Sequence, residues 1–445
     1  MNQSSASPGA TALHRGTSSM RTVVSWAMWD WGAQPLNTVV ITFVFSVYIT
    51  SAAFGTENDT SIALSVSTAV SGLIVALVAP VLGQNSDRTG RTVRNLRWQT
   101  WLMALLVAGL FFVRPEPGYL WIGLGILGVA SIVGEIASVN YYALLDEVAT
   151  KENVGRVSGF GWGMGYLGGI IALLVLYFGF ISPDVGLFGV SDTDGLDIRA
   201  SMVVCGVWIL VFTLPTFLAL RDRPRPAVPR LGVRAAYRRL GQSIAAVWRT
   251  NRQTMYFLGA SALFRDGLAG VFAFGAVLAA GTFGFTAGDV IVFGAAANVI
   301  AGVSTMLFGL LDDRIGPRKV ILISLGALVV LGTCIFLLHD RGQIVFWTFG
   351  MAMTAFVGPA QSASRSFLAR LIPSGQAGEM FGLYATTGRV ISFLSPAFFG
   401  AAILIGAAVT GQENTQYWGI LGIVVILLAG FVVMLRVQDP DPVVG

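Results

Sequence analysis

Charged side chains fall inside the long apolar stretches of this 445-residue chain, three acidic and three basic. They are Asp30, Glu135, Asp266, Arg265, Arg365 and Arg389. A charge at the centre of a bilayer costs about 2.5 kcal/mol or more, so charges balanced in sign are expected to face one another or a wet cavity. Carboxylates there could carry protons, and guanidinium groups could bind a substrate anion through two parallel hydrogen bonds.

Neutral polar residues extend these positions into stripes along predicted helices. Asp30, Gln34 and Asn37 stand at i, i+4 and i+7, which places them on one helical face. Polar residues also occur within the other predicted helices. Together they predict a substrate and proton site formed by Asp30, Gln34, Asn37, Glu135, Ser138, Tyr142, Arg265, Asp266, Gln361, Arg365, Tyr384 and Arg389. The alternative for each charge is a buried ion pair that only fixes helix packing, and the Arg389 side chain could instead snorkel.

The elements that position these residues must be membrane-spanning helices. Mean hydropathy is +0.73 and only 11% of residues are charged, whereas about a quarter of a soluble domain is charged. Runs of roughly 20 apolar residues fall near residues 23–50, 62–82, 96–113, 119–145, 157–181, 199–220, 253–280, 288–311, 319–338, 343–371, 379–407 and 417–436. We therefore expect an all-α integral membrane protein with twelve transmembrane helices.

The distribution of basic residues predicts orientation. Between Arg221 and Arg252 the chain is basic, and one set of loops is rich in arginine. The opposite loops carry only Arg114, Arg199 and Arg341. Because basic loops remain in the cytoplasm, we expect both termini there, in a bacterial cytoplasmic membrane. The net charge of +5 then reflects orientation rather than nucleic-acid binding.

A polar stretch between two apolar runs occurs twice. Gly83, Asp87, Arg88, Gly90 and Arg91 lie in the first copy. A second copy, 226 positions later, repeats the spacing with Gly309, Asp313, Arg314 and Gly316. We expect each to be a charged loop with a tight turn at its glycines. A repeat at about half the chain length predicts two pseudo-symmetric bundles of six helices.

These stretches resemble the loop signature of the major facilitator superfamily, whose members are secondary transporters. The resemblance implies a gate that holds the cytoplasmic side shut, formed by Gly83, Asp87, Arg88, Gly90, Arg91, Gly309, Asp313, Arg314 and Gly316. The alternative is an ordinary basic turn that only orients its helices.

Further motifs indicate a narrower resemblance. Arg265-Asp266-Gly267, Gln361-Ser362-Ala363-Ser364-Arg365-Ser366 and Glu379-Met380-Phe381-Gly382-Leu383-Tyr384 are similar to the "unknown major facilitator" family. That family is related to fungal vacuolar amino-acid effluxers linked to autophagy. The resemblance implies fold and transport more firmly than cargo, and Asp146 departs from the proline expected in the Leu-Leu-x-Glu segment.

Five regions follow: a disordered tail at residues 1–21, bundles at 22–220 and 253–437, a basic linker at 221–252 and a tail at 438–445. The linker is expected to form a short helix on the anionic leaflet. Two isolated cysteines and two histidines outside the apolar runs indicate neither disulfide, metal site nor cofactor.

We expect a monomeric, proton-coupled transporter of a small polar or zwitterionic solute, such as an amino acid. Its partners are this solute, protons and the lipid bilayer. The alternatives are an exporter of amphipathic drugs or lipids, and a sensor or scaffold that transports nothing. An enzyme is not expected, because no nucleophile, His-carboxylate pair or metal cluster falls at membrane depth.

Overall fold

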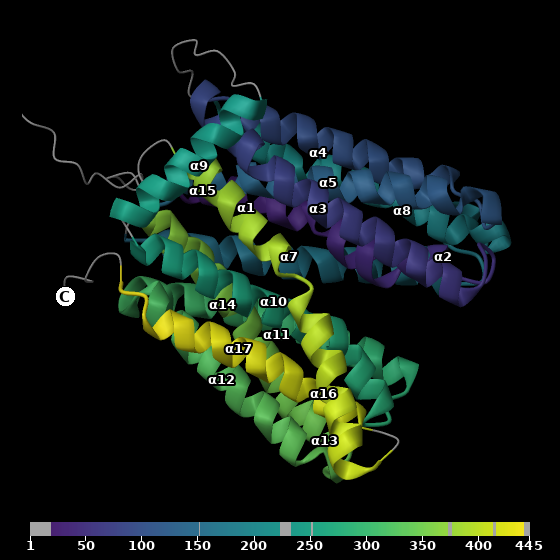
Figure 1. The fold of residues 1–445 in the computed structure, drawn as a ribbon. Coiled ribbons are helices and arrows are strands. Elements are labelled where there is room, and N and C mark those ends of the chain that lie inside the picture. The colour runs from purple at the N-terminus through teal and green to yellow at the C-terminus, as the bar shows by residue number, and fades with distance from the viewer. Residues whose placement is uncertain are drawn as a thin grey trace, which may run out of the picture.

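The computed structural model describes residues 19–150, 152–222, 233–250, 252–372, 376–412 and 415–439. Residues 1–18 and 440–445 of the predicted tails, and residues 223–232 of the predicted linker, lie outside this part of the chain. Figure 1 shows two bundles of long helices, one from each half of the sequence, that diverge towards one end of the molecule. The fold is therefore all-helical and divided into two halves, as predicted.

Six transmembrane segments form the first bundle. Their helices are α1 (Met20–Ala33) continued by η1 (Leu36–Phe43) and α2 (Phe45–Ile49), α3 (Glu57–Thr89), α4 (Thr92–Gly109) with η2 (Leu110–Phe112), η3 (Pro117–Tyr119) with α5 (Leu120–Ala143), α7 (Val154–Leu176) with η4 (Tyr177–Ile181), and α8 (Leu196–Ala219). Short helices lie between them at α6 (Leu145–Val148), η5 (Leu187–Gly189) and η6 (Thr193–Gly195).

Six more segments form the second bundle. They are α10 (Arg252–Gly281), α11 (Ala287–Ile315), α12 (Pro317–Leu337), α13 (Gln343–Val345) with η8 (Phe346–Gly350) and α14 (Met351–Leu371), α15 (Ala377–Val390) with α16 (Leu394–Thr410), and η9 (Gln416–Trp418) with α17 (Gly419–Leu435). The turn η7 (His339–Arg341) follows α12.

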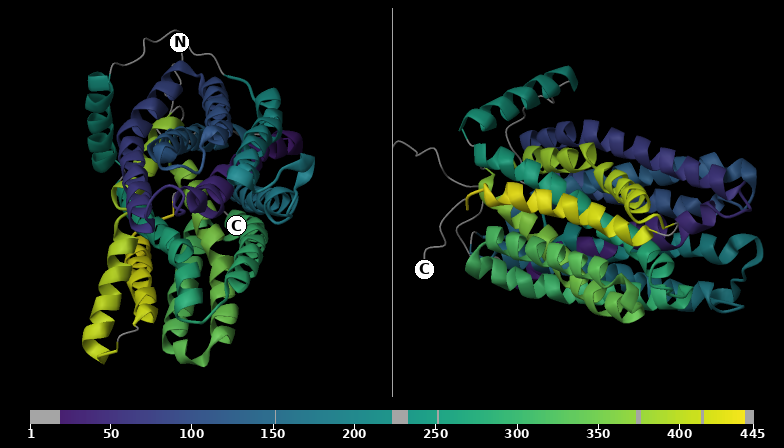
Figure 2. Two further views of the ribbon diagram at one scale, coloured as in Figure 1. Left: turned by 90° about the vertical axis from the view of Figure 1, so that its right-hand side faces the viewer. Right: turned by 60° about the horizontal axis from the view of Figure 1, so that its bottom comes forward.

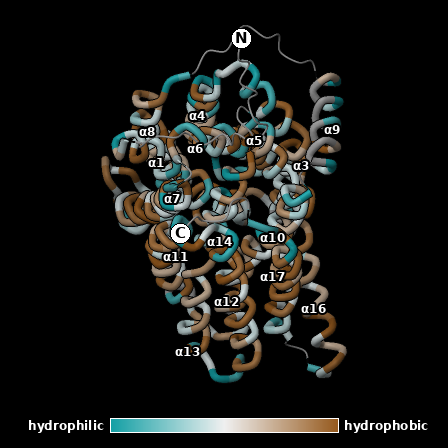
Figure 3. Tube along the Cα trace, turned by 90° about the vertical axis from the view of Figure 1, so that its left-hand side faces the viewer, coloured by the Kyte–Doolittle hydropathy of each residue, from teal (hydrophilic) through white to brown (hydrophobic). Residues whose placement is uncertain are grey.

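Within the described residues, eleven helical segments are long and apolar enough to cross a membrane. The twelfth expected segment is α4, which packs against α5 and α8. Its first two turns contain Arg94 and Arg97, which lower its hydropathy, and it is not among the eleven segments. Figure 3 shows mainly hydrophobic residues along α12, α16 and α17, and hydrophilic residues near α6, α7 and α14.

Hydrogen bonds between sequence-distant segments identify one end of the molecule. Asp222, after α8, accepts a hydrogen bond from the Arg94 backbone at the start of α4 (3.1 Å). Gln438, after α17, donates from its backbone to Gln253 at the start of α10 (2.9 Å). We call this the terminal end, and the opposite one the far end. Figure 1 shows the bundles close together at the terminal end and splayed at the far end, and Figure 2 gives two further views.

The linker contains α9 (Val233–Thr250), an 18-residue helix in the region expected to hold a short one. Arg234, Arg238 and Arg249 are exposed on it. The Tyr237 hydroxyl donates to the backbone oxygen of Leu77 in α3, so α9 lies against the first bundle. In Figure 2 the helix runs beside the transmembrane helices rather than among them.

The interpretation of both polar stretches as loops is wrong. Asp87 and Arg88 lie within α3, and Asp313 and Arg314 lie within α11, because each helix continues beyond its apolar part. A helix satisfies its own backbone hydrogen bonds whether or not it remains in the bilayer, so leaving the membrane does not end it. Only Gly90 (φ 61°) and Gly316 (φ 89°) form the turns.

Gly83 and Gly309 have a packing role instead. A Cβ atom at Gly83 would lie 2.1 Å from the backbone oxygen of Gly378 in α15. One at Gly309 would lie 2.8 Å from the backbone oxygen of Gly155 in α7. Glycine is therefore needed where α3 meets α15 and where α11 meets α7. These two contacts join the bundles at the terminal end.

Candidate functional site

A cavity of about 810 Å³ lies between the two bundles. Ten of the twelve predicted site residues line it: Asp30, Gln34, Asn37, Glu135, Ser138, Tyr142, Arg265, Asp266, Gln361 and Arg389. The other two, Arg365 and Tyr384, are 1% and 3% exposed and lie behind its wall. The polar stripes expected from helical spacing therefore face a common space.

The unusual backbone of the first segment positions its polar stripe. After Pro35 the chain continues as the π-helical η1, which contains Asn37. The Thr42 hydroxyl donates to the backbone oxygen of Asn37 (2.7 Å), five residues before it. Wide turns of this kind are frequent at functional sites. Asp30, Gln34 and Asn37 all reach the cavity from this segment.

Asp30 and Arg365 form a buried ion pair across the two bundles. Arg365 Nη1 lies 3.6 Å from Asp30 Oδ2, and its side chain is 1% exposed. Arg365 Nη2 also donates to the backbone oxygen of Ser158 in α7 (2.7 Å). The guanidinium lies over the rings of Tyr142 (4.9 Å) and Trp162 (4.5 Å). In this conformation Arg365 joins α14 to the first bundle and is not presented to the cavity.

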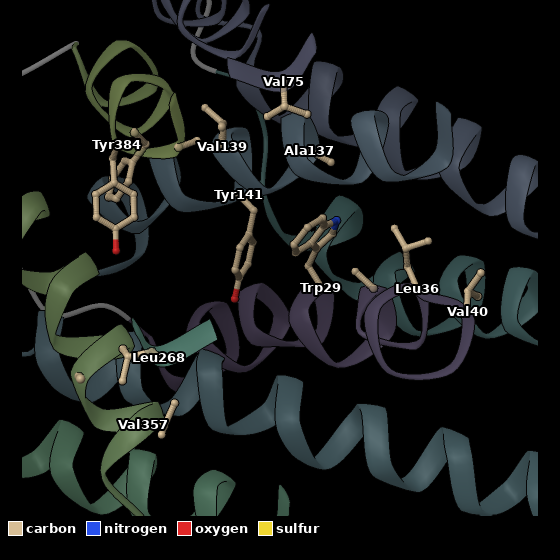
Figure 4. Packing of buried hydrophobic residues seen from close by; sticks show 14 of the residues in the cluster. Trp29, Leu36, Val40, Val75, Ala137, Val139, Tyr141, Leu268, Val357 and Tyr384 are labelled. Atoms are coloured by element: carbon tan, nitrogen blue, oxygen red, sulfur yellow. The ribbon is translucent and has the colours of Figure 1, made fainter. Parts of the chain in front are cut away.

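Aromatic stacking orients the helical turn that carries Asp30. Trp26 and Trp29 each stack on Tyr141 with ring centroids 4.5 Å apart. Trp26 Nε1 donates to the backbone oxygen of Tyr141 (3.2 Å), and Trp29 Nε1 donates to Thr100 (2.9 Å). Figure 4 shows the Trp29 and Tyr141 rings lying side by side. These contacts fasten α1 to α4 and α5.

Glu135 and Arg389 form a second ion pair across the bundles. Arg389 Nη2 is hydrogen-bonded to Glu135 Oε1, which joins α15 to α5. Each side chain is 35% exposed, and both line the cavity. This pair is therefore accessible to a molecule in the cavity, whereas the Asp30–Arg365 pair is largely covered.

Arg265 and Asp266 are neighbours in sequence but have separate partners. Arg265 Nη1 donates to the backbone oxygen of Tyr384 (2.9 Å), and its guanidinium lies 3.8 Å from the centre of the Tyr384 ring. Among the described residues, no carboxylate lies within 4.0 Å of Arg265. Asp266 accepts a hydrogen bond from the Ser395 backbone at the start of α16 (2.7 Å). Arg265 is therefore a cavity cation whose charge is not neutralised by an adjacent acid.

Several residues that line the cavity were not predicted from the sequence. They are Trp29, Trp162, Tyr166, Phe272 and Asn298. The aromatic residues could not be assigned to the cavity from the sequence, because a ring in an apolar segment can face lipid, the protein core or a cavity. Asn298 offered a signal, since it is an amide inside an apolar run of the segment that becomes α11.

At the terminal end, Asp87 and Asp313 occupy equivalent positions in the two halves. Asp87 accepts hydrogen bonds from the backbone amides of Gly378 and Glu379 at the start of α15, both at 2.8 Å. Asp313 accepts them from Gly155 and Arg156 at the start of α7, at 2.7 and 3.0 Å. Each carboxylate satisfies free amides at a helix N-terminus, where negative charge is favoured. The two bundles are thereby attached to each other at two points of the terminal end, one through Asp87 and one through Asp313.

One further ion pair joins the bundles at the second attachment, because Arg156 of α7 lies 3.8 Å from Asp313. Arg370 lies 3.0 Å from Asp312 and 3.3 Å from Asp313, and these pairs are within the second bundle. Arg88 and Arg314 lie in the last turns of α3 and α11, and Arg91 precedes α4.

Comparison with known proteins gives the family. Residues 46–440 match the family described as "Vacuole effluxer Atg22 like". The MFS-type transporter YxiO of Bacillus subtilis is 25% identical over 430 residues, covering 93% of this chain and 94% of that protein. Autophagy-related protein 22 of Botryotinia fuckeliana is 28% identical over 64% of this chain, which spans 50% of the fungal protein's length.

Solved structures give the same fold. The proton:xylose symporter XylE has a TM-score of 0.67 at 14% identity, covering 94% of this chain and 95% of that one. A bacterial homologue of the iron transporter ferroportin, in its outward-facing state, has a TM-score of 0.66 at 14% identity, covering 94% and 98%. With two six-helix bundles around a charged cavity, the chain belongs to the Atg22-like vacuole effluxer family of major facilitator superfamily transporters.

Proposed function

We propose that this protein is a secondary active transporter that moves a small polar or zwitterionic solute by alternating access. The observation that carries the proposal is the cavity of about 810 Å³, which is lined by Asp30 and Glu135 of the first bundle and by Arg265, Asp266 and Arg389 of the second. The attachments through Asp87 and Asp313 lie at the terminal end only. Rocking of one bundle against the other would open that end and close the far end.

The cavity wall favours a solute that carries both charges. Arg265 offers a guanidinium without an adjacent carboxylate, which suits an anionic group. Asp30 and Glu135 offer carboxylates that suit an ammonium group, and the rings of Trp162 and Tyr166 can take part through cation–π contact. An amino acid has this combination of groups, and it is our first candidate substrate.

Asp30 and Glu135 are the proposed proton carriers. Each faces an arginine of the opposite bundle, so protonation of the carboxylate would weaken a contact that joins the bundles. Proton uptake and the movement of the bundles would then be coupled. We place the terminal end in the cytoplasm, because Arg221 and Arg252, at the two ends of the basic linker, are next to residues whose hydrogen bonds lie at that end.

Reconstitution tests both parts of this proposal. Purified protein in proteoliposomes preloaded with mixed unlabelled amino acids is expected to accumulate a radiolabelled amino acid by counterflow. An imposed pH gradient is expected to drive uptake in the wild type, while Asp30→Asn retains counterflow and loses the response to the gradient. Normal gradient-driven uptake by Asp30→Asn would contradict proton coupling through this residue.

The aromatic part of the cavity wall favours a second candidate, an exporter of amphipathic molecules. Trp29, Trp162, Tyr166 and Phe272 give the cavity large apolar surfaces. A lipophilic cationic dye that competes with the counterflow signal, or is moved when amino acids are not, would favour this candidate. Binding without counterflow of either class would favour a sensor or scaffold.

A further inference from the structure

The eleventh transmembrane segment is two helices rather than one. The part nearer the terminal end, α15, ends at Val390, and the part nearer the far end, α16, begins at Leu394. Pro396 has no N–H and cannot donate to the backbone oxygen of Ser392. The Ser395 N–H, which would otherwise donate to Ile391, is directed to Asp266. Two successive helical hydrogen bonds are therefore missing, which accounts for the break.

The two parts pack against opposite bundles. A Cβ atom at Gly382 of α15 would lie 2.8 Å from the backbone oxygen of Ala79, so α15 is in direct contact with α3 of the first bundle. A Cβ atom at Gly422 of α17 would lie 2.2 Å from the backbone oxygen of Phe398, so α16 is in direct contact with the second bundle. Figure 1 shows α15 beside the first bundle and α16 diverging from it towards the far end.

One face of α3 is covered by α15 over only half its length. Ala79 and Gly83 on that face contact α15. The same face continues towards the far end through Gly72, Thr68 and Leu64, which line the open cavity. If the joint at Ile391–Phe393 straightened, α16 would extend along these positions and cover that side of the cavity.

The adjacent residues Arg265 and Asp266 bind the two helices on either side of the break at Ile391–Phe393. Arg265 binds the backbone oxygen of Tyr384 in α15, while Asp266 binds the backbone amide of Ser395 in α16. The Ser395 hydroxyl also donates to the backbone oxygen of Asp266 (2.8 Å). A Cβ atom at Gly270 would lie 2.4 Å from that hydroxyl oxygen, so glycine permits the close approach.

The rest of α16 packs against the second bundle. Of its residues, Ser395, Phe399 and Gly406 are the buried ones. Phe399 stacks on Phe274 of α10 with ring centroids 4.0 Å apart. A Cβ atom at Gly419 of α17 would lie 2.4 Å from the Phe399 ring, so movement of α16 would break contacts with both α10 and α17.

We propose that α16 is a lid that turns about Ile391–Phe393 to cover the far side of the cavity, and that Asp266 is the positioning residue that holds it open. The lid rests on the proposed transport by alternating access, but it is a movement within the second bundle. Rocking of whole bundles would leave distances inside that bundle unchanged. The two movements can therefore be measured separately.

Two pairs of spin labels distinguish them, in a background of Cys205→Ala and Cys334→Ala. The lid pair, Ile344→Cys with Leu404→Cys, joins two exposed positions of the second bundle. The bundle pair, Phe188→Cys with Ile344→Cys, joins exposed positions of opposite bundles. Distances are measured by double electron–electron resonance on the full chain in lipid nanodiscs.

Asp266→Ala is expected to shift or broaden the lid-pair distances and leave the bundle-pair distances unchanged. Pro396→Ala restores the missing donor and is expected to shift the lid pair towards a straighter segment, which keeps the test valid if Asp266→Ala does not fold. Asp340→Ala, in an exposed loop, is the matched control and should change neither pair. Unchanged lid-pair distances in both Asp266→Ala and Pro396→Ala would overturn the lid.

A third variant tests the underlying transport movement independently. Asp87→Ala removes the attachment of α3 to α15 at the terminal end, so it is expected to change the bundle-pair distances. If it does not, rocking of the bundles is contradicted, whatever the lid pair shows. Loss of one movement with retention of the other therefore identifies which proposal is wrong.

Discussion

Replacing Arg365 by leucine would leave the Asp30 carboxylate without its counter-charge in a covered position. Arg365 lies 3.6 Å from Asp30, donates to Ser158 at 2.7 Å and lies 4.5 Å from the Trp162 ring. Removing one member of a buried pair costs about 3–5 kcal/mol, because the other charge is left unpaired. Loss of the ring contact adds about 1 kcal/mol. We expect Arg365→Leu to lower the free energy of unfolding by about 5 kcal/mol in total.

The double variant Asp30→Asn/Arg365→Leu has no unpaired charge, so its loss should be smaller than the sum of the losses in the two single variants. Residues in contact typically couple by about 0.5–3 kcal/mol, so we expect the double variant to be about 2 kcal/mol more stable than that sum predicts. Unfolding is measured by denaturant titration in detergent micelles, with tryptophan fluorescence as the signal. Arg341→Leu is the control, because Arg341 is an exposed arginine of the same bundle.

Two results would refute this reasoning. If Arg365→Leu destabilises the protein no more than the Arg341→Leu control, the buried pair contributes nothing measurable. If the losses for Asp30→Asn and Arg365→Leu simply add, the two side chains are not coupled, and the cost must come from the Ser158 and Trp162 contacts instead.

The remaining predictions concern the gate and the accessible ion pair. Asp87→Ala and Asp313→Ala should each increase maleimide labelling of cysteines placed at the terminal end, because each removes two hydrogen bonds worth about 3 kcal/mol together, or roughly 100-fold in the open population. Gly83→Val should increase the same labelling, because its side chain would clash with α15. Glu135→Gln should reduce counterflow at least tenfold by unpairing Arg389, yet change the free energy of unfolding by about 1 kcal/mol or less, because the pair is partly exposed and screened.

Controls accompany each of these changes. Gly109→Val is matched to Gly83→Val, since nothing lies within 4 Å of the added Cβ atom, and it should not alter labelling. Arg389→Lys keeps the charge next to Glu135 and should retain more counterflow than Arg389→Gln. Unchanged labelling in both Asp87→Ala and Asp313→Ala would contradict the gate, and full counterflow in Glu135→Gln would contradict a transport role for that pair.

Local periodicity was sufficient to predict part of the site. Asp30, Gln34 and Asn37 share a face because residues four and three apart always do so on a helix. The high cost of lipid-exposed charge then predicted that this face points inward, and it does line the cavity. The partners of these residues could not be predicted the same way, because three acids and three arginines allow several pairings.

The sequence by itself determined that the chain spans a membrane, that it is a duplicated unit, and which helical faces are polar, because hydropathy, repeats and periodicity are properties of neighbouring residues. Tertiary structure alone decided that Asp30 is paired with Arg365, that no carboxylate of the described residues lies within 4.0 Å of Arg265 and that Asp266 binds the start of α16. It also decided that Asp87 and Asp313 cap helices of the opposite bundle. These contacts join residues more than 100 positions apart, so they depend on how the helices and bundles pack. A local sequence pattern does not predict this packing.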